Sequence, residues 1–157
     1  MDVSDDEILT LWRLLNQHQV KYILVGGFAT MFNGFNRVTS DLDLWIKDTL
    51  ENRKALRAAL KDFGLGDFEA IETVQFIAGF SSMRLDSGFE LDLMTSLKGL
   101  DQSEFDACYE ISPTAVIDGV SIKFLHLNRL IDAKRASSRP KDLVDLEELE
   151  KIRKNLT

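Results

Sequence analysis

Two short segments of this sequence alternate strictly between apolar and acidic residues, and the first of them is Asp41–Ile46. Because side chains on a strand point alternately to opposite faces, its aliphatic residues form one face. Asp41 and Asp43 lie on the other face, with their Cα atoms about 6.5–7 Å apart. Two carboxylates at that separation can share divalent cations, and Mg2+ prefers one or two carboxylates plus substrate phosphates. Taken alone, the pair fits a solvated strand face as well as a functional site.

The second alternating segment, residues 89–94, repeats this arrangement. Its apolar residues share one face, whereas Glu90 and Asp92 share the other. If this strand neighbours Asp41–Ile46, Asp92 joins the pair as a third carboxylate. We expect Glu90 to be a solvated residue near the start of the strand. Because aspartate is unfavourable in strands, two acidic segments of this kind favour a functional role.

A pair of glycines, Gly26-Gly27, follows the apolar run Tyr22–Val25, which predicts a short buried strand. Glycine lets a backbone approach a phosphate closely, and free N–H groups at the start of a helix attract anions. We expect a small helix over about residues 28–33, closed by Gly34. Thirteen residues separate Gly27 from Asp41. One short connection can therefore place phosphate-binding backbone beside metal-binding carboxylates.

The rest of the pattern predicts an α/β (α+β) fold, with a mixed β-sheet, packed helices and a C-terminal helical pair. The Ser-Asp-Asp-Glu run at residues 4–7 is a capping box that opens a first helix. Asp118-Gly119 between two apolar runs is a strong hairpin signal, and Pro140 suits the first turn of a final helix. Further helices are expected over residues 50–63, 127–136 and 140–153, and further strands over 71–78, 80–85, 115–117 and 120–124.

The composition bounds the classes of protein that this chain can belong to. Its 157 residues are 45% hydrophobic, so we expect one domain, with an α/β core over residues 1–125 and a helical segment over 126–157 packed on it. The net charge of −7 argues against non-specific coating of nucleic acid. Cys108 is the only cysteine, which excludes an intramolecular disulfide and a structural zinc site. An acidic start and no membrane-length apolar run predict a cytoplasmic protein with no membrane partner.

Taken together, the motifs resemble the nucleotidyltransferase superfamily, the fold shared by polymerase β and antibiotic nucleotidyltransferases. The family pattern is an apolar strand, Gly-Gly or Gly-Ser, a short spacer, Asp-x-Asp on a strand, and a third carboxylate on a later strand. This chain supplies Gly26-Gly27, then Asp41-Leu42-Asp43, then Asp92. Residues 26–43 and 130–146 also look like the small bacterial branch, which includes the AbiEii-type toxin and the lincosamide nucleotidyltransferases.

The resemblance implies an enzyme that moves a nucleoside monophosphate from a nucleoside triphosphate to an acceptor hydroxyl by two-metal catalysis, releasing pyrophosphate. The implied cofactor is Mg2+, held by Asp41, Asp43 and Asp92, which are also the implied catalytic residues. Asp92 would ligate the catalytic metal and favour deprotonation of the acceptor hydroxyl. The nucleotide-binding residues implied in the same way are Gly26, Gly27, Thr39, Ser40, Lys134 and Lys141.

Two function classes stay open at this point. The first is a working transferase whose acceptor is tRNA, a protein or a small molecule. The second is a non-catalytic nucleotide-binding protein, or a toxin–antitoxin partner, of the same fold. Larger relatives carry a further substrate-binding domain, so we expect that a protein partner or a homodimer can complete the site. The cations of residues 129–141 fit either contact with phosphate or a solvated helical surface.

Three further expectations concern residues near these motifs. Phe28, Phe32 and Phe35 lie close to the proposed nucleotide site in the sequence. We expect them to pack in the core, with stacking on a base as the alternative. His126 precedes a predicted helix and is expected to be a capping or surface residue.

Overall fold

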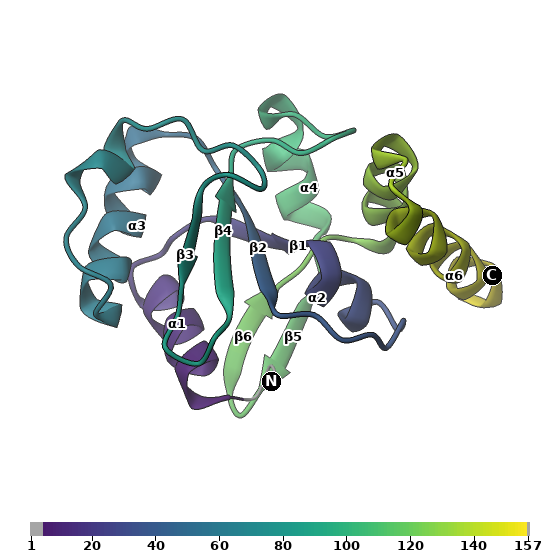
Figure 1. Cartoon of the computed structure of the whole chain (residues 1–157), viewed down its shortest axis with the longest axis horizontal. Coiled ribbons are helices and arrows are strands. Elements are labelled where there is room, and N and C mark those ends of the chain that lie inside the picture. Colours follow the sequence, from purple (N-terminus) through teal and green to yellow (C-terminus); the bar gives the residue numbers. More distant parts are fainter. Residues whose placement is uncertain (1–4, 157) are drawn as a thin grey trace.

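A computed structural model describes residues 5–156 of the chain. Its centre is a four-stranded sheet in the order β1-β2-β4-β3 (Figure 1). β2 and β4 are parallel, whereas β1 runs antiparallel to β2, and β3 runs antiparallel to β4. The sheet is therefore mixed, as the sequence predicts. The strands are β1 (Tyr22–Val25), β2 (Asp41–Ile46), β3 (Ser82–Arg84) and β4 (Glu90–Met94).

Helices surround this sheet, and two of them form an arm at one end of the molecule. Figure 1 shows α5 and α6 together beyond α2, on the side of the sheet opposite to α3. Within residues 5–156, none of the helices combines the length and the apolar composition needed to cross a bilayer. The helices are α1 (Asp6–Gln17), α2 (Gly26–Phe32), α3 (Leu50–Phe63), α4 (Phe105–Ile111), α5 (Leu127–Ser137) and α6 (Pro140–Leu156), with 3-10 turns η1 (Glu69–Glu72) and η2 (Gln102–Glu104).

The central strand β2 is covered on both faces for most of its length. Its aliphatic residues are fully buried on one face, as the alternation predicts. On the other face the Trp45 ring meets the edge of Phe105, with ring centroids 5.2 Å apart. Its Nε1 donates a hydrogen bond of 2.8 Å to the carbonyl oxygen of Thr95. The acidic face is therefore open only in the first half of β2, where Asp41 and Asp43 lie.

Local signals in the sequence account for several element boundaries. The hairpin of β5 (Thr114–Ile117) and β6 (Val120–Lys123) turns at Asp118-Gly119. Both turn residues have positive φ, of 49° and 77°, as a type I′ turn requires. Nδ1 of His126 accepts a hydrogen bond from the backbone N–H of Asn128, which confirms its expected capping role. Asp5 caps α1 by accepting from the N–H of Glu7, while the first residue of the predicted capping box lies outside the described residues.

The prediction of a strand over residues 71–78 is wrong, because a buried arginine organises this segment differently. Nη1 of Arg53, on α3, donates to the carbonyl oxygens of Ile71 and Val74 at 3.1 and 2.7 Å. Its guanidinium also lies 4.7 Å from the centre of the Phe76 ring. Those carbonyl groups therefore accept their hydrogen bonds from a side chain instead of from the backbone of a neighbouring strand.

Other elements also differ from the expectations. Instead of the strand expected over residues 80–85, β3 covers only Ser82–Arg84, and α2 begins at Gly26 rather than at residue 28. The helix α4 was not anticipated. A signal for it was present, because Asp101 and Glu104 form a capping box at the start of the preceding 3-10 turn.

Asn52 ties α3 to the sheet through three hydrogen bonds, and its removal tests this connection. Its side chain accepts from the N–H of Lys21 at 2.7 Å and donates to the carbonyls of Lys21 and Lys47 at 2.9 and 2.8 Å. Since a buried group without its partner costs about 1–3 kcal/mol, we expect Asn52→Ala to lower the free energy of unfolding by about 2–4 kcal/mol in urea denaturation. Leu50→Ala, at a half-exposed position of the same helix, is the control and should cost under about 1 kcal/mol.

Candidate active site

The parallel pairing of β2 with β4 brings the three predicted aspartates together. Asp43 is the register partner of Asp92, and Asp41 is the register partner of Glu90. All of these side chains point to the same face of the sheet, since register partners share a face. Asp41 is exposed, Asp43 is half-buried and Asp92 is buried. Glu90 is partly exposed and pairs with Arg84, in accordance with the expectation of a solvated residue.

Gly26 allows the chain to pass close to Asp43. Its φ is +69°, and a Cβ atom at this position would lie 2.1 Å from Oδ2 of Asp43. A side chain is therefore excluded by the carboxylate as well as by the backbone conformation. At Gly27, a Cβ atom would lie 2.9 Å from Oγ1 of Thr39. The Gly26-Gly27 turn, Thr39 and Asp43 consequently form one closely packed unit.

The three aspartates repel one another in a partly water-free environment. Burial raises the pKa of Asp43 to about 7, and the charges of Asp92 and Asp41 add to the rise, whereas Lys134 and Lys141 reduce it. Burial also raises the pKa of Asp92. Such a site favours the binding of cations and protons, because both reduce the repulsion between the carboxylates.

Within the described part of the chain, Asp92 is hydrogen-bonded through one carboxylate oxygen and unpartnered at the other. Its Oδ2 accepts a 2.7 Å hydrogen bond from the N–H of Gly79, and the N–H of Ser81 provides a second backbone contact to the carboxylate. Its Oδ1 is buried and has no hydrogen-bond partner among the described residues. In residues 5–156, no three His, Cys, Asp or Glu side chains are grouped closely enough to hold a metal ion by themselves. A cation at this face would thus take one or two of the carboxylates and fill its other positions with water or substrate, which suits Mg2+.

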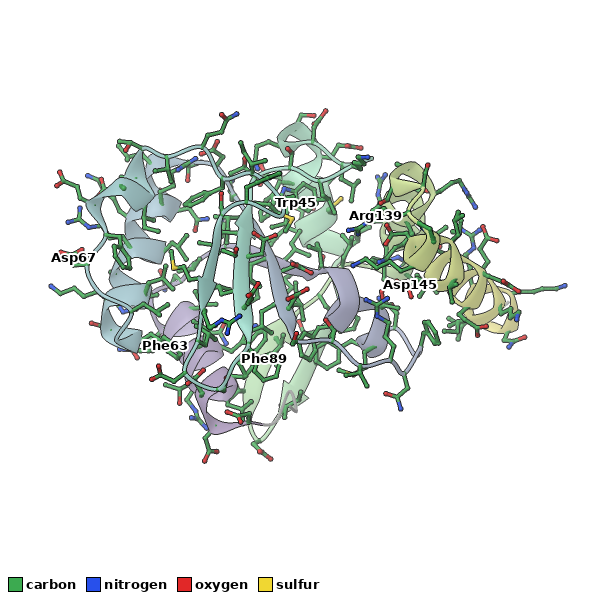
Figure 2. All side chains as sticks on the ribbon, viewed as in Figure 1. Trp45, Phe63, Asp67, Phe89, Arg139 and Asp145 are labelled. Atoms are coloured by element: carbon green, nitrogen blue, oxygen red, sulfur yellow. The ribbon has the colours of Figure 1, made fainter. Side chains whose placement is uncertain are left out.

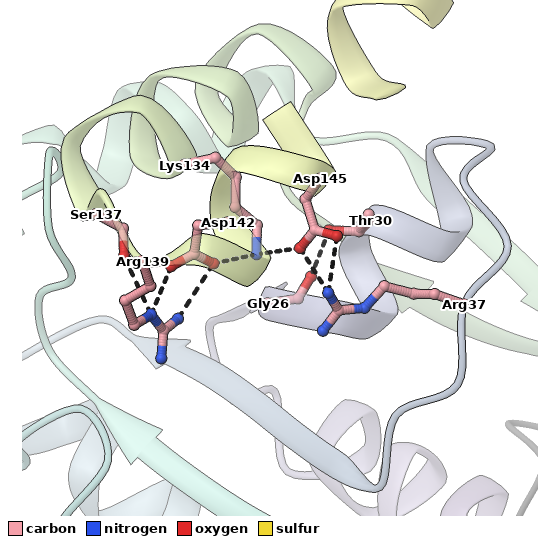
Figure 3. A network of polar contacts seen from close by, with 8 residues as sticks. All are labelled: Gly26, Thr30, Arg37, Lys134, Ser137, Arg139, Asp142 and Asp145. Atoms are coloured by element: carbon pink, nitrogen blue, oxygen red, sulfur yellow. Dashed lines mark hydrogen bonds and ion pairs between the residues drawn. The ribbon is translucent and has the colours of Figure 1, made fainter. Parts of the chain in front are cut away.

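Lys134 and Lys141 reach the site in different ways. Lys134 is buried, and its Nζ lies 3.0 Å from Oδ1 of Asp142 and 2.9 Å from Oδ2 of Asp145 (Figure 3). It is therefore part of an ion-pair network between α5 and α6 rather than a solvated cation. Lys141 is exposed and borders the aspartates from the start of α6.

The same network contains residues that the sequence reasoning did not select. Arg37 and Arg139 bind Asp145 and Asp142, respectively, and Arg139 and Asp145 lie on the side of the arm that faces the sheet (Figure 2). Although burial opposes it, hydrogen bonds from Arg139, Ser137 and Lys134 hold the pKa of Asp142 below its usual range. A signal for these residues existed in the Arg-x-Lys-Asp-x-x-Asp run of residues 139–145.

Two cavities meet at the acidic face. The first, of about 370 Å³, is lined by the three aspartates together with Gly26, Lys134 and Lys141. The second is lined by Thr39 and Ser40, and Asp41 and Lys141 border both. Gly27 is buried beside them and lines neither. Of the three phenylalanines, Phe28 and Phe32 pack with tilted rings against Phe89 and Phe124, whereas Phe35 lines the second cavity.

Comparisons with known proteins concern the family and the fold of this chain. A family model described as a nucleotidyl transferase of unknown function (DUF2204) matches residues 4–157. An antigenic nucleotidyltransferase-like protein from Paracoccidioides brasiliensis has a similar crystal structure, with a TM-score of 0.57 at 20% identity over 94% of this chain and 76% of that chain. The antibiotic-resistance factor ANT(2'')-Ia is similar with a TM-score of 0.50 at 16% identity, over 99% and 92% of the two chains. No curated protein matches the chain.

The raised pKa of Asp43 predicts a pH-dependent stability. Between about pH 4 and 7 the folded protein retains a proton on Asp43 that the unfolded chain has lost, so stability falls as the pH rises through this window. We expect Asp43→Asn to remove this dependence and to stabilise the protein at pH 8 by on the order of 2–4 kcal/mol, at 1.36 kcal/mol per pKa unit. The measurement is urea unfolding from pH 4 to 8 in chelator-treated buffer.

Asp86→Asn is the matched control for this experiment, since Asp86 is exposed on the loop before β4. It should keep the pH profile of the wild type. If Asp43→Asn unfolds more easily than the wild type at pH 8, then Asp43 stabilises the fold and the repulsion among the aspartates is not the dominant effect.

Proposed function

The chain belongs to the DUF2204 family of nucleotidyl transferases, and on that premise we propose that it transfers a nucleoside monophosphate from a nucleoside triphosphate to an acceptor hydroxyl, with release of pyrophosphate. The observation that carries the proposal is the placement of Asp41, Asp43 and Asp92 on one sheet face by the β2–β4 register. Their mutual repulsion, together with the unpartnered Oδ1 of Asp92, supports the binding of a divalent cation there.

Mg2+ is the proposed cofactor, with Asp41 and Asp43 as the residues that would hold an ion on the nucleotide side and Asp92 as the residue that would hold an ion on the acceptor side. When bound, it supplies a positive charge that offsets the negative charge of the reacting phosphate. The donor set fits this ion, because Mg2+ binds carboxylate oxygens and keeps several positions for water and phosphate. No nitrogen or sulfur ligand is needed, in keeping with the scarcity of histidine and cysteine in the chain.

In the proposed reaction, the acceptor hydroxyl oxygen forms a bond to the α-phosphorus, and the bond from this phosphorus to the bridging oxygen of the pyrophosphate breaks. Asp92 acts as the general base that takes the proton of the hydroxyl. The N–H groups of Gly79, on Oδ2, and of Ser81 hold the Asp92 carboxylate in place during this step.

The two cavities provide room for two substrates. We assign the second cavity, with Thr39 and Ser40, to the nucleotide, whose triphosphate would reach Gly26 and the aspartates at Asp41 and Lys141, where the two cavities meet. The acceptor would then enter the first cavity, which Asp92 lines. Lys141 borders both cavities and is placed to balance the charge of the triphosphate. The acceptor is tRNA, a protein or a small molecule, and a protein partner or a second copy of the chain can complete its binding site.

A transfer assay tests this function. The protein is incubated with Mg2+, cell extract and each of the four ribonucleoside triphosphates, labelled at the α-phosphate, and the labelled product is isolated. We expect transfer of the label with one or more nucleotides, dependence on Mg2+, and a loss of at least about 100-fold in Asp43→Asn, because removing one interaction that stabilises charge in the transition state costs 10²–10³. Nucleotide binding without any transfer would instead favour the non-catalytic, toxin–antitoxin partner alternative.

Asp92→Asn separates binding from chemistry. The other two aspartates remain on the nucleotide side, so we expect magnesium nucleotide to raise the melting temperature of this variant nearly as much as that of the wild type. Transfer should fall by at least about 100-fold, because a typical general base contributes 10²–10⁴. If the variant keeps its transfer rate, Asp92 is not the base.

A further inference from the structure

Arg37 lies in the connection between α2 and β2, and its side chain crosses to the first turn of α2 (Figure 3). One terminal nitrogen, Nη1, donates to both carboxylate oxygens of Asp145 on α6, at 2.8 and 2.6 Å. Asp145 is almost fully buried, with 2% of its side chain exposed, compared with 23% for Arg37. The guanidinium is thus held at one corner by a carboxylate that lies 108 residues away in the sequence.

The opposite edge of the guanidinium has no such partner. Nε of Arg37 is buried and makes no hydrogen bond among the described residues. Nη2 lies 3.1 Å from the position that a Cβ atom of Gly27 would occupy, so this edge lies against the Gly26-Gly27 turn. Nε and Nη2 together form the fork of two parallel N–H groups that matches two oxygens of a phosphate. A buried donor left without an acceptor is unfavourable, and a phosphate at this edge would satisfy it.

The charges around Arg37 also favour an anion. Three cations, Arg37, Lys134 and Arg139, share the two carboxylates Asp142 and Asp145, which leaves one positive charge in excess. Arg37 lines the second cavity together with the cation Lys141 and the carboxylates Asp41 and Asp145, so Arg37 and Lys141 are the groups there that can bind an anion. The attraction between an anion and these cations at hydrogen-bond distance is stronger where both are partly shielded from water.

We propose that Arg37 is a nucleotide-binding residue that grips a phosphate of the triphosphate with its Nε–Nη2 edge, and that Asp145 is the positioning residue that aims this edge. The proposal rests on the proposed function, because it places the triphosphate beside the Gly26-Gly27 turn. It also gives the C-terminal helix α6 a part in nucleotide binding, since the orientation of Arg37 depends on a carboxylate of that helix.

Calorimetric titration tests the proposal with two probes, magnesium with each of the four ribonucleoside triphosphates and magnesium with tripolyphosphate. Arg37→Gln removes the charge and the fork, whereas Arg37→Lys keeps the charge and an ion pair with Asp145 but loses the fork. We expect both variants to bind the triphosphates and tripolyphosphate roughly 10- to 100-fold more weakly than the wild type, the range for hydrogen bonds to charged groups. Arg13→Gln, an equal charge change on the exposed face of α1, should bind as the wild type does.

Asp145→Asn tests the positioning role. The amide can still accept a hydrogen bond from Nη1 but no longer fixes the guanidinium through two charged contacts. We expect weaker binding of both probes, by a smaller factor than in Arg37→Gln, and no additional weakening when the two substitutions are combined. Additive losses in the double variant would overturn the role of Asp145, because they would show that it acts independently of Arg37.

The outcomes distinguish this proposal from the one on which it rests. If the wild type and the Arg37 variants bind triphosphate equally well, then Arg37 does not contact the nucleotide, although the transferase function stands. If Arg37→Gln loses triphosphate binding but keeps that of tripolyphosphate, then the contact is not to phosphate and the proposal is wrong. If the wild type binds no triphosphate in the presence of magnesium, both proposals fail together. Urea unfolding of Arg37→Lys verifies that the fold is intact in the comparison.

Discussion

The site depends on keeping three like charges together on one sheet face. The parallel register of β2 and β4 places Asp43 opposite Asp92, and burial by the surrounding elements makes their repulsion stronger than it would be in water. The fold opposes this with backbone N–H groups at Asp92 and with cations from the C-terminal arm. In the proposed function, a magnesium nucleotide offsets the remaining repulsion among the aspartates. This repulsion destabilises the free protein, so its relief favours binding.

The arm of α5 and α6 contributes buried apolar residues such as Leu130, Ile131 and Leu149 to the core, and charged contacts tie it to the connection before β2. A continuous chain of ion pairs runs from Arg139 through Asp142, Lys134 and Asp145 to Arg37 (Figure 3). Buried pairs of this kind contribute little net stability, but removing one charged member is costly because its partners then lack a counter-charge. The position of the arm is thereby linked to the connection that leads into β2, and so to the aspartates themselves.

The parts of the fold that the sequence predicts are those governed by local patterns. Strict alternation located β2 and placed Asp41, Asp43 and Asp92 on a shared face, and the Asp118-Gly119 turn located the hairpin. The strand predicted over residues 71–78 failed because Arg53, distant in the sequence, satisfies its carbonyl groups. The contact of Arg37 with Asp145 could not be predicted for a similar reason, since it exists only when the arm is folded against α2. The roles assigned to Thr39, Ser40, Lys134 and Lys141 stay predictions, and for Lys134 the structure adds two carboxylate partners that the sequence did not indicate.

Gly26 and Asp43 occupy a space that only one side chain can fill. A methyl group at Gly26 would overlap Oδ2 of Asp43, so the two positions cannot change independently. A chain of this fold that carries a larger residue at the first position has to move or give up the carboxylate at the second. The pair can therefore be used to sort related chains. Chains that keep both residues retain room for the Asp43 carboxylate, whereas chains with a side chain at the first position lack this room.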